Sequence, residues 1–193
     1  MSAAFERCVR GGGVAVFPAD TVYGLACDPD APAAVERLYA LKGRPPEKPA
    51  AVMLFSLAAA ADVLAGLPAR VEHAARTLLP GSLTLLVPNP GRRFPGAGGG
   101  EVLGLRVPDL PALAEVQAAV LQTSANLAGA PEAVTLAEVP EAIRGGADLV
   151  LDGGPLPGTP STVVDLTGYE RDGSWSVVRE GAVSRAVLRD ALG

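Results

Sequence analysis

The sequence predicts an α/β fold, in which helices cover much of a β-sheet, organised as one domain over residues 1–193. Short apolar runs of strand length alternate along the whole chain with amphipathic runs of helical length. Hydrophobic residues make up 49% of the chain and charged residues 19%, which is typical of a globular protein with a sizeable core. No linker divides the chain and no internal repeat is visible, so one domain is expected.

In the N-terminal part, glycine and proline residues mark where several apolar runs end. Gly11-Gly12-Gly13 separates a short helix from a buried strand, Pro18 ends that strand, and Pro80-Gly81 stops a later helix. The expected elements are, in order, a helix over Phe5–Arg10, a strand over Val14–Phe17, a loop over Ala19–Gly24, an amphipathic helix over Ala33–Leu41, a strand over Ala50–Phe55 and helices over Leu57–Ala65 and Val71–Leu79.

The C-terminal part continues the alternation, with β-branched and leucine-rich runs as strands and alanine-rich runs as helices. The elements expected there are strands over Leu83–Val87 and Val102–Val107, a helix over Leu110–Ala119, a strand over Val120–Thr123, a helix over Leu136–Ile143, strands over Leu149–Leu151, Ser161–Leu166 and Trp175–Arg179, and a helix over Ser184–Leu192. The loop over residues 88–101 is long for a compact domain, so we expect it to be functional or mobile.

Composition argues against several classes of function. Cys8 and Cys27 are too few for a disulfide framework, and His73 is the single histidine, so we expect no zinc site and no His-based triad. A formal net charge of −5 and few aromatic residues argue against bulk attraction to nucleic acid and against base-stacking platforms. No apolar run is long enough to span a membrane, and the N-terminus lacks the pattern of a signal peptide, so a cytoplasmic location is expected.

A basic loop, Lys42–Pro49, follows one predicted helix and precedes a predicted strand. Lys42, Arg44 and Lys48 fall on backbone in which Pro45, Pro46 and Pro49 prevent a regular helix. Such a loop suits a polyphosphate or another anion, although a solvated surface turn is the alternative.

Three other loops carry polar side chains where predicted strands begin or end, the usual position of ligand sites in α/β proteins. They are Asp20-Thr21, Thr123-Ser124-Ala125-Asn126 and Pro160-Ser161-Thr162. Each is also explained by turn, capping or strand-end hydrogen bonds.

Two arginines lie in or at the end of apolar strands. Arg106 is embedded in Val102–Val107, and a guanidinium there needs a partner, either a ligand carboxylate or an acidic residue such as Asp109. Arg179 ends a strand beside Glu180, so either a ligand or a salt bridge with that carboxylate explains it. Arg92 and Arg93 in the 88–101 loop are either solvated or contacts for RNA phosphate.

Taken together, these segments resemble the YrdC-like family, the threonylcarbamoyl-AMP synthases. The resemblance runs from about residue 10 to the C-terminus, and its seven pieces occur in the family's order. They are Pro18–Leu25, Leu41–Pro45 with Lys48-Pro49, Pro80–Thr84, Leu105–Pro108, Thr123–Asn126, Pro160–Asp165 and Val178–Gly181.

The resemblance implies a single YrdC-like domain, with a twisted mixed sheet flanked by helices and a concave ligand cavity. It implies a nucleotidyltransferase, L-threonylcarbamoyladenylate synthase, which uses L-threonine, bicarbonate and ATP with Mg²⁺ and releases pyrophosphate. A partner complex then transfers the threonylcarbamoyl group to tRNA, so tRNA and that complex are possible partners. No membrane partner is implied.

The family's site residues carry over by motif. The resemblance places Thr21, Arg106, Ser124 and Ser161 around threonine, with Arg106 facing the carboxylate. It places Lys42, Arg44, Lys48, Asn126 and Arg179 at ATP, and we assign the catalytic role at the phosphates to Arg44 and Lys48. Thr84 is expected to support the site.

Two departures from the family pattern concern the threonine and ATP sites. Many relatives place a histidine near the amino acid where this chain has Met53, and Leu127-Ala128-Gly129 lacks a hydroxyl that the family often carries. Neither departure removes a charge, so we expect altered ligand affinity before loss of activity.

Two other functions remain as alternatives. One is the carbamoyl-transfer chemistry of hydrogenase-maturation proteins, which share this fold but normally carry zinc-finger and acylphosphatase-like domains that are not visible here. The other is a non-catalytic RNA-binding module that uses the cavity with Arg92 and Arg93, against which the acidic charge and few aromatics argue.

Overall fold

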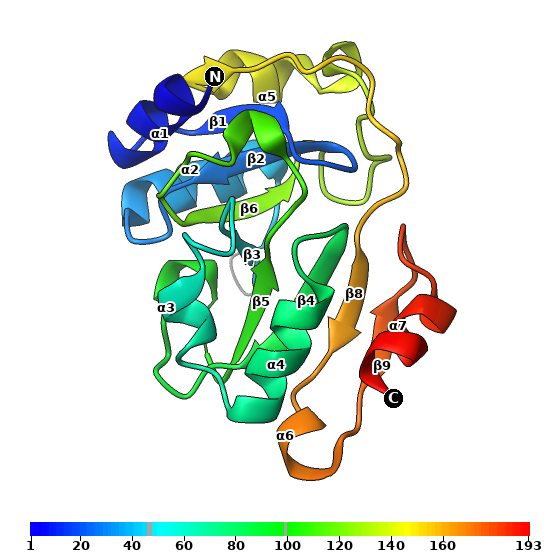
Figure 1. The fold of residues 1–193 in the computed structure, drawn as a ribbon. Helices are drawn as coiled ribbons and strands as arrows, with labels where there is room; N and C mark the ends of the chain where they lie inside the picture. Colours follow the sequence, from blue (N-terminus) through cyan, green and yellow to red (C-terminus); the bar gives the residue numbers. More distant parts are fainter. Residues whose placement is uncertain (46–47, 99) are drawn as a thin grey trace.

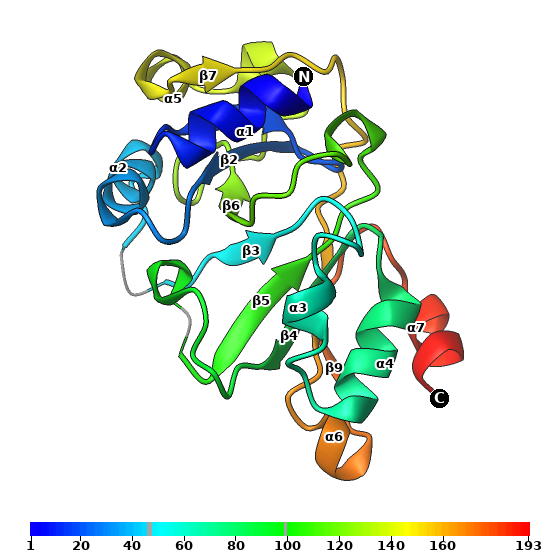
Figure 2. The same cartoon turned by 60° about the vertical axis from the view of Figure 1, so that its left-hand side comes forward.

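The computed structural model describes residues 1–45, 48–98 and 100–193, and its strands form one twisted mixed sheet (Figure 1). The strand order is β7-β1-β2-β6-β3-β5-β4-β8-β9. Pairs β1–β7, β3–β5 and β4–β8 are parallel and the remaining pairs are antiparallel. The two termini lie at opposite ends of this sheet (Figures 1 and 2). The predicted α/β class and mixed sheet are confirmed.

The strands are short and mostly buried. Their bounds are β1 Ala15–Pro18, β2 Tyr23–Cys27, β3 Ala51–Met53, β4 Leu83–Pro88, β5 Val102–Arg106, β6 Val120–Ser124, β7 Leu149–Val150, β8 Thr162–Asp165 and β9 Ser176–Arg179. The α-helices are α1 Ser2–Arg10, α2 Pro32–Lys42, α3 Ala61–Leu64, α4 Ala69–Leu78, α5 Glu141–Gly146, α6 Tyr169–Asp172 and α7 Arg185–Leu192.

The larger core packs on one face of the sheet. Alternate strand residues such as Val16, Leu25 and Leu85 belong to this core, together with residues of α2, α3, α4, α5 and α7. A smaller core packs on the other face, where Phe5 of α1, Phe17 and Phe55 form an aromatic cluster with ring centroids 5.0 to 6.2 Å apart. Figure 2 shows α1 across the β1–β2 end of the sheet. Met53, Leu113 and Val116 also belong to this smaller core.

Strand β2 is not predicted from the sequence. Residues 19–24 were expected to be a loop, but the loop is shorter and β2 begins at Tyr23. Asp20 has a φ of 76°, and the backbone N–H of Ala19 bonds to the carbonyl of Val22. This tight turn pairs β1 with β2 and buries all five residues of β2.

Three helix predictions were wrong or too long. Leu110–Ala119 contains only a 3-10 turn, Pro111–Leu113, because tertiary packing buries Leu113 and Val116 without a helix. Leu136–Ile143 is divided at Pro140, which separates the 3-10 turn Leu136–Glu138 from α5. Leu57–Ala65 is a series of turns before the four-residue α3.

Candidate active site

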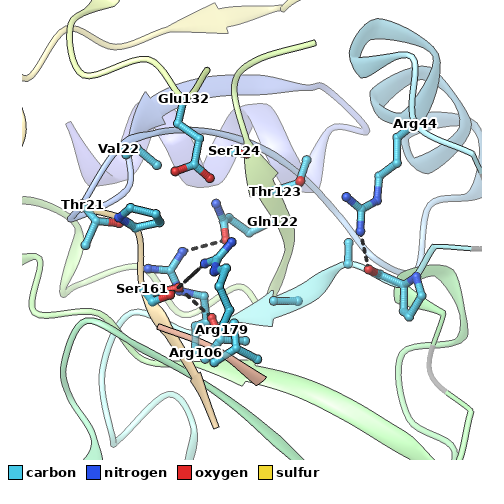
Figure 3. Close-up of a pocket in the computed structure, with 16 residues that line it drawn as sticks. Thr21, Val22, Arg44, Arg106, Gln122, Thr123, Ser124, Glu132, Ser161 and Arg179 are labelled. Atoms are coloured by element: carbon cyan, nitrogen blue, oxygen red, sulfur yellow. Dashed lines mark hydrogen bonds between the residues drawn. The ribbon is translucent and has the colours of Figure 1, made fainter. Parts of the chain in front are cut away.

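A polar cavity of about 220 Å³ opens on the second face of the sheet (Figure 3). The strand register explains this grouping, because partnered residues and every second residue of a strand share a face. Its charged and polar side chains are Thr21, Arg44, Thr84, Arg106, Gln122, Thr123, Ser124, Glu132, Ser161 and Arg179.

Arg106 lies at the floor of this cavity and is only 4% exposed. Its Nη1 donates to Oε1 of Gln122 at 2.9 Å, whereas Nε and Nη2 are buried with no hydrogen-bond partner among the described residues. Burial lowers the pKa of Arg106 to about 10, with nearby Asp20 opposing the shift, so the side chain remains a cation at neutral pH. A buried cation with two free donors provides a site for an anion.

A second arginine flanks the first. Arg179 of β9 lines the cavity beside Arg106, and its Nη2 donates to the carbonyl and the hydroxyl of Ser161 at 2.8 and 3.2 Å (Figure 3). The Ser161 hydroxyl lies 2.9 Å from Oγ1 of Thr84. The alternative for Arg179, a salt bridge with Glu180, is absent from the described ion pairs, so Ser161 and Thr84 orient Arg179 instead.

The segment after β9 packs tightly on the start of β8. The backbone N–H of Ala182 donates to the carbonyl of Pro160 at 2.9 Å, and a Cβ on Gly181 would stand 2.6 Å from the carbonyl carbon of Ser161. Only a residue without a side chain permits this approach. Gly181 therefore fixes the backbone between Arg179 and Ser161.

We expect Gly181→Ala to destabilise the fold by about 1–3 kcal/mol, because the Ser161 backbone has to shift. The expected displacement also reduces binding of the ligand that Arg179 contacts. Chemical denaturation checks the first effect, and Gly91→Ala, whose Cβ would lie 3.7 Å from Cγ of Arg93, is the matched control. Equal stability of the two variants would contradict the packing argument.

Thr21 lies on the opposite rim of the cavity and is 2% exposed. Its carbonyl accepts from the backbone N–H of Gly158 at 2.9 Å, so the two loops are held together. Next to it, Oδ2 of Asp20 accepts from the Ser82 hydroxyl at 2.7 Å. The positive φ of Asp20 is part of the turn that brings Thr21 to the cavity.

Lys42 lies behind the cavity wall and is not one of its lining residues. Its Nζ is within hydrogen-bond distance of the Ser124 carbonyl and hydroxyl, at 2.6 and 3.2 Å, and of the Asn126 carbonyl and Oδ1, at 3.0 and 2.8 Å. The Asn126 amide donates to the carbonyls of Leu127 and Ala130. Lys42 thus connects α2 to the loop after β6. The hydrogen bonds of the Asn126 side chain likewise stabilise that loop.

Burial lowers the pKa of Lys42 to about 8, and nearby Arg44 lowers it further while Glu132 opposes. Above this pKa the folded protein releases the proton while the unfolded chain still binds it, up to the ordinary value of 10.5. The free energy of unfolding should therefore rise with pH across this window.

We expect this rise to amount to about 1–3 kcal/mol and to disappear in Lys42→Met, which has no titrating group. Urea titrations of both proteins at pH values below and above this window measure the difference. Parallel pH profiles for the wild type and Lys42→Met would contradict the burial of a charged Lys42.

Arg44 reaches the cavity from the basic loop. Its Nη2 donates to the Pro49 carbonyl at 2.6 Å (Figure 3). Its Nε donates to the Lys48 carbonyl at 3.2 Å. Lys48 is exposed and does not line the cavity, and Pro46 and Glu47 of the predicted loop lie outside the described residues. The structure therefore brings Arg44, but not the Lys48 side chain, to the cavity wall.

The charge on the cavity wall is mainly positive. Arg44, Arg106 and Arg179 oppose one carboxylate, Glu132, and none of the three arginines forms an ion pair in the described part of the chain. Figure 3 shows Glu132 directed toward Gln122 from the far side of the cavity. No group of three or more metal-ligating side chains is found within residues 1–45, 48–98 and 100–193.

Comparison with known proteins decides the family. Residues 7–181 match the family model named Sua5/YciO/YrdC, whose description is "telomere recombination". The chain belongs to this family. It is 38% identical over 169 residues to the threonylcarbamoyl-AMP synthase of Chromohalobacter salexigens, covering 84% of this chain and 90% of that protein.

Longer members of the Sua5/YciO/YrdC family match as well. The chain is 30% identical over 192 residues to the threonylcarbamoyl-AMP synthase of Bacillus subtilis and spans 54% of that protein's length. Among solved structures, Sua5 of P. abyssi in complex with L-threonine superposes with a TM-score of 0.82 and 28% identity, covering 98% of this chain and 56% of that one. The chain thus spans about half the length of these two relatives.

The two departures from the family pattern lie in different places. Met53 is fully buried in the smaller core, paired in register with Arg106, but it is not a lining residue of the cavity. Leu127 is 45% exposed and Ala128 donates its N–H to the carbonyl of Lys42. Whether either residue changes affinity in this Sua5/YciO/YrdC member stays a prediction.

Two polar lining residues are not predicted from the sequence. Gln122 and Glu132 both face the cavity, yet neither forms part of a segment that was singled out. The alternation of β6 was the available signal for Gln122, because Ser124, two residues later, was expected at the site. No comparable signal marks Glu132.

Proposed function

We propose that this protein is an L-threonylcarbamoyladenylate synthase and, in reaction class, a nucleotidyltransferase. The observation that carries the proposal is the buried edge of Arg106, whose Nε and Nη2 have no partner among the described residues. Such an edge matches a carboxylate in two parallel hydrogen bonds. Relatives named threonylcarbamoyl-AMP synthase and a relative solved with L-threonine support threonine as the source of that carboxylate.

In this proposal, threonine binds with its carboxylate on Arg106. Thr21, Ser161 and Ser124 line the same cavity and provide hydroxyl or backbone groups for the remainder of the amino acid. Thr84 bonds to Ser161 and thereby supports the site. Holding the carboxylate would fix the amino group for reaction with bicarbonate.

Two bonds form in the proposed reaction. The threonine nitrogen and bicarbonate combine to N-carboxy-threonine with loss of water, and a carbamate oxygen then attacks the α-phosphorus of ATP. The bond from that phosphorus to the pyrophosphate oxygen breaks, which leaves threonylcarbamoyl-AMP and pyrophosphate. This chemistry needs no protein nucleophile and depends on positioning and on stabilisation of phosphate charge.

With Arg106 assigned to the carboxylate, Arg44 and Arg179 are the cations of the cavity wall that would bind the phosphates of ATP. Lys48 of the basic loop is a further candidate. Lys42 and Asn126 support the Ser124 loop from behind. Mg²⁺ is proposed to arrive bound to ATP, since Mg²⁺ commonly uses substrate phosphates and water with one or two carboxylates, and Glu132 is the carboxylate on the wall. Its chemistry would be neutralisation of phosphate charge.

The test is pyrophosphate release from ATP and bicarbonate, with and without L-threonine. The proposal predicts release that depends on threonine. ATP hydrolysis that ignores threonine, or turnover of carbamoyl phosphate in its place, would overturn the proposal in favour of the carbamoyl-transfer alternative.

RNA contact by Arg92 and Arg93 is a separate hypothesis. Arg92 lies 3.8 Å from Glu101, and Arg93 donates to the Asp62 carbonyl at 2.8 Å, so both have partners within the chain. We therefore favour the synthase over an RNA-binding module. Binding of tRNA, a transfer complex and a cytoplasmic location remain predictions from the sequence. Within the described residues, no helix is long and apolar enough to cross a membrane.

A further inference from the structure

Gln122 controls which edge of Arg106 is free. A guanidinium is planar and presents two donors side by side at Nε and Nη2. Oε1 of Gln122 accepts from the remaining nitrogen, Nη1, at 2.9 Å, and these same two nitrogens, Nε and Nη2, are left without a partner in the described structure. The hydrogen bond therefore fixes the plane of the guanidinium without occupying its bidentate edge.

Gln122 is itself held in place. It is 4% exposed and lies in the middle of β6, between β2 and β3, where it pairs in register with Ala26 and Ala51. Beside it, a Cβ on Gly24 would stand 3.0 Å from Nε2 of Gln122 and 2.9 Å from Cβ of Ala19. The bare backbone of Gly24 thus leaves the space that the Gln122 amide fills.

The neutrality of Gln122 is as important as its length. A carboxylate at this position would pair with Arg106 and cancel the charge that attracts an anion. An apolar residue would leave Nη1 buried without an acceptor and leave the guanidinium free to turn. A neutral acceptor orients Arg106 and preserves its charge.

We propose that Gln122 is the positioning residue of the amino acid site, which orients Arg106 so that its Nε and Nη2 receive the substrate carboxylate. This inference rests on the proposed function, because the ligand is taken to be an amino acid. It assigns a role in threonine binding to Gln122 that is exerted through the orientation of Arg106.

Two variants separate positioning from mere packing. Gln122→Met keeps the length of the side chain but provides no good acceptor, and Gln122→Glu keeps both shape and acceptor but adds a charge. Isothermal titration calorimetry measures the affinity of each variant for L-threonine and, separately, for ATP. Thermal unfolding verifies that each variant is folded.

We expect Gln122→Met to weaken threonine binding by about tenfold to hundredfold, the range for a hydrogen bond to a charged group, and to change ATP binding by less than about threefold. Gln122→Glu should weaken threonine binding at least as much while unfolding near the wild-type temperature. A purely structural role predicts that Gln122→Glu binds threonine like the wild type, and that result would overturn the inference.

A double-mutant cycle completes the test. In an Arg106→Ala background, Gln122→Met should change threonine affinity by less than about twofold, because both substitutions remove the same contact. Independent, additive effects would overturn the inference. If the wild-type protein does not bind threonine, the proposed function fails and the inference with it, whereas threonine binding that is unchanged in Gln122→Met defeats the inference alone.

Discussion

Replacing Arg106 with alanine is expected to raise the KM for threonine by at least about thirtyfold, since truncating one partner of a buried charge pair costs about 2–5 kcal/mol. The variant loses both free donors that face the carboxylate, and it leaves Gln122 without its partner. The KM for ATP should change far less, because Arg44 and Arg179 remain on the wall. Steady-state kinetics with each substrate varied in turn provides the measurement.

Arg106→Lys is the matched control for charge. It keeps a cation but cannot form two parallel hydrogen bonds while also bonding to Gln122, so its KM for threonine should fall between those of the wild type and the alanine variant. Unchanged threonine kinetics in Arg106→Ala would remove Arg106 from the amino acid site.

Arg44→Ala is expected to lower kcat/KM for ATP by about tenfold or more, the loss for a charge-assisted contact to phosphate. The guanidinium lies on the cavity wall, and its bonds to the carbonyls of Lys48 and Pro49 also shape the basic loop. The KM for threonine should be affected less.

Lys48→Ala is the comparison within the same loop. Because the Lys48 side chain is exposed and does not line the cavity, we expect its loss to weaken ATP use less than the loss of Arg44. An equal or larger effect of Lys48→Ala would show that the basic loop rearranges to bring Lys48 to the phosphates.

The polar positions next to strands were the most predictable part of the site. Arg106 stood out because a guanidinium in an apolar strand needs a partner, and the structure places it on the cavity floor. Ser161 and Thr21 were found from their places at strand ends. The segments that contain Lys42 and Asn126 were both expected at the site, and they do meet. The sequence could not show that the two side chains bond to each other behind the cavity wall.

Other features depend on three-dimensional packing. The course of β2 is set by the turn at Asp20 and by burial on both faces, which the sequence pattern does not show. The composition of Leu110–Ala119 favours a helix, but packing leaves only a 3-10 turn there. Gln122 and Glu132 are ordinary residues in the sequence. They become part of the site only when the sheet brings β6 and the segment after it to the cavity, with β3 between β6 and β5.

The most direct test of the proposed reaction is to incubate the purified protein with ATP, L-threonine and ¹³C-bicarbonate and to analyse the products by mass spectrometry. The proposed reaction yields threonylcarbamoyl-AMP that carries the labelled carbon, together with an equal amount of pyrophosphate, and we expect almost none of either from Arg106→Ala at low threonine. Pyrophosphate without the labelled adenylate, or an adenylate without the label, would contradict the proposed reaction.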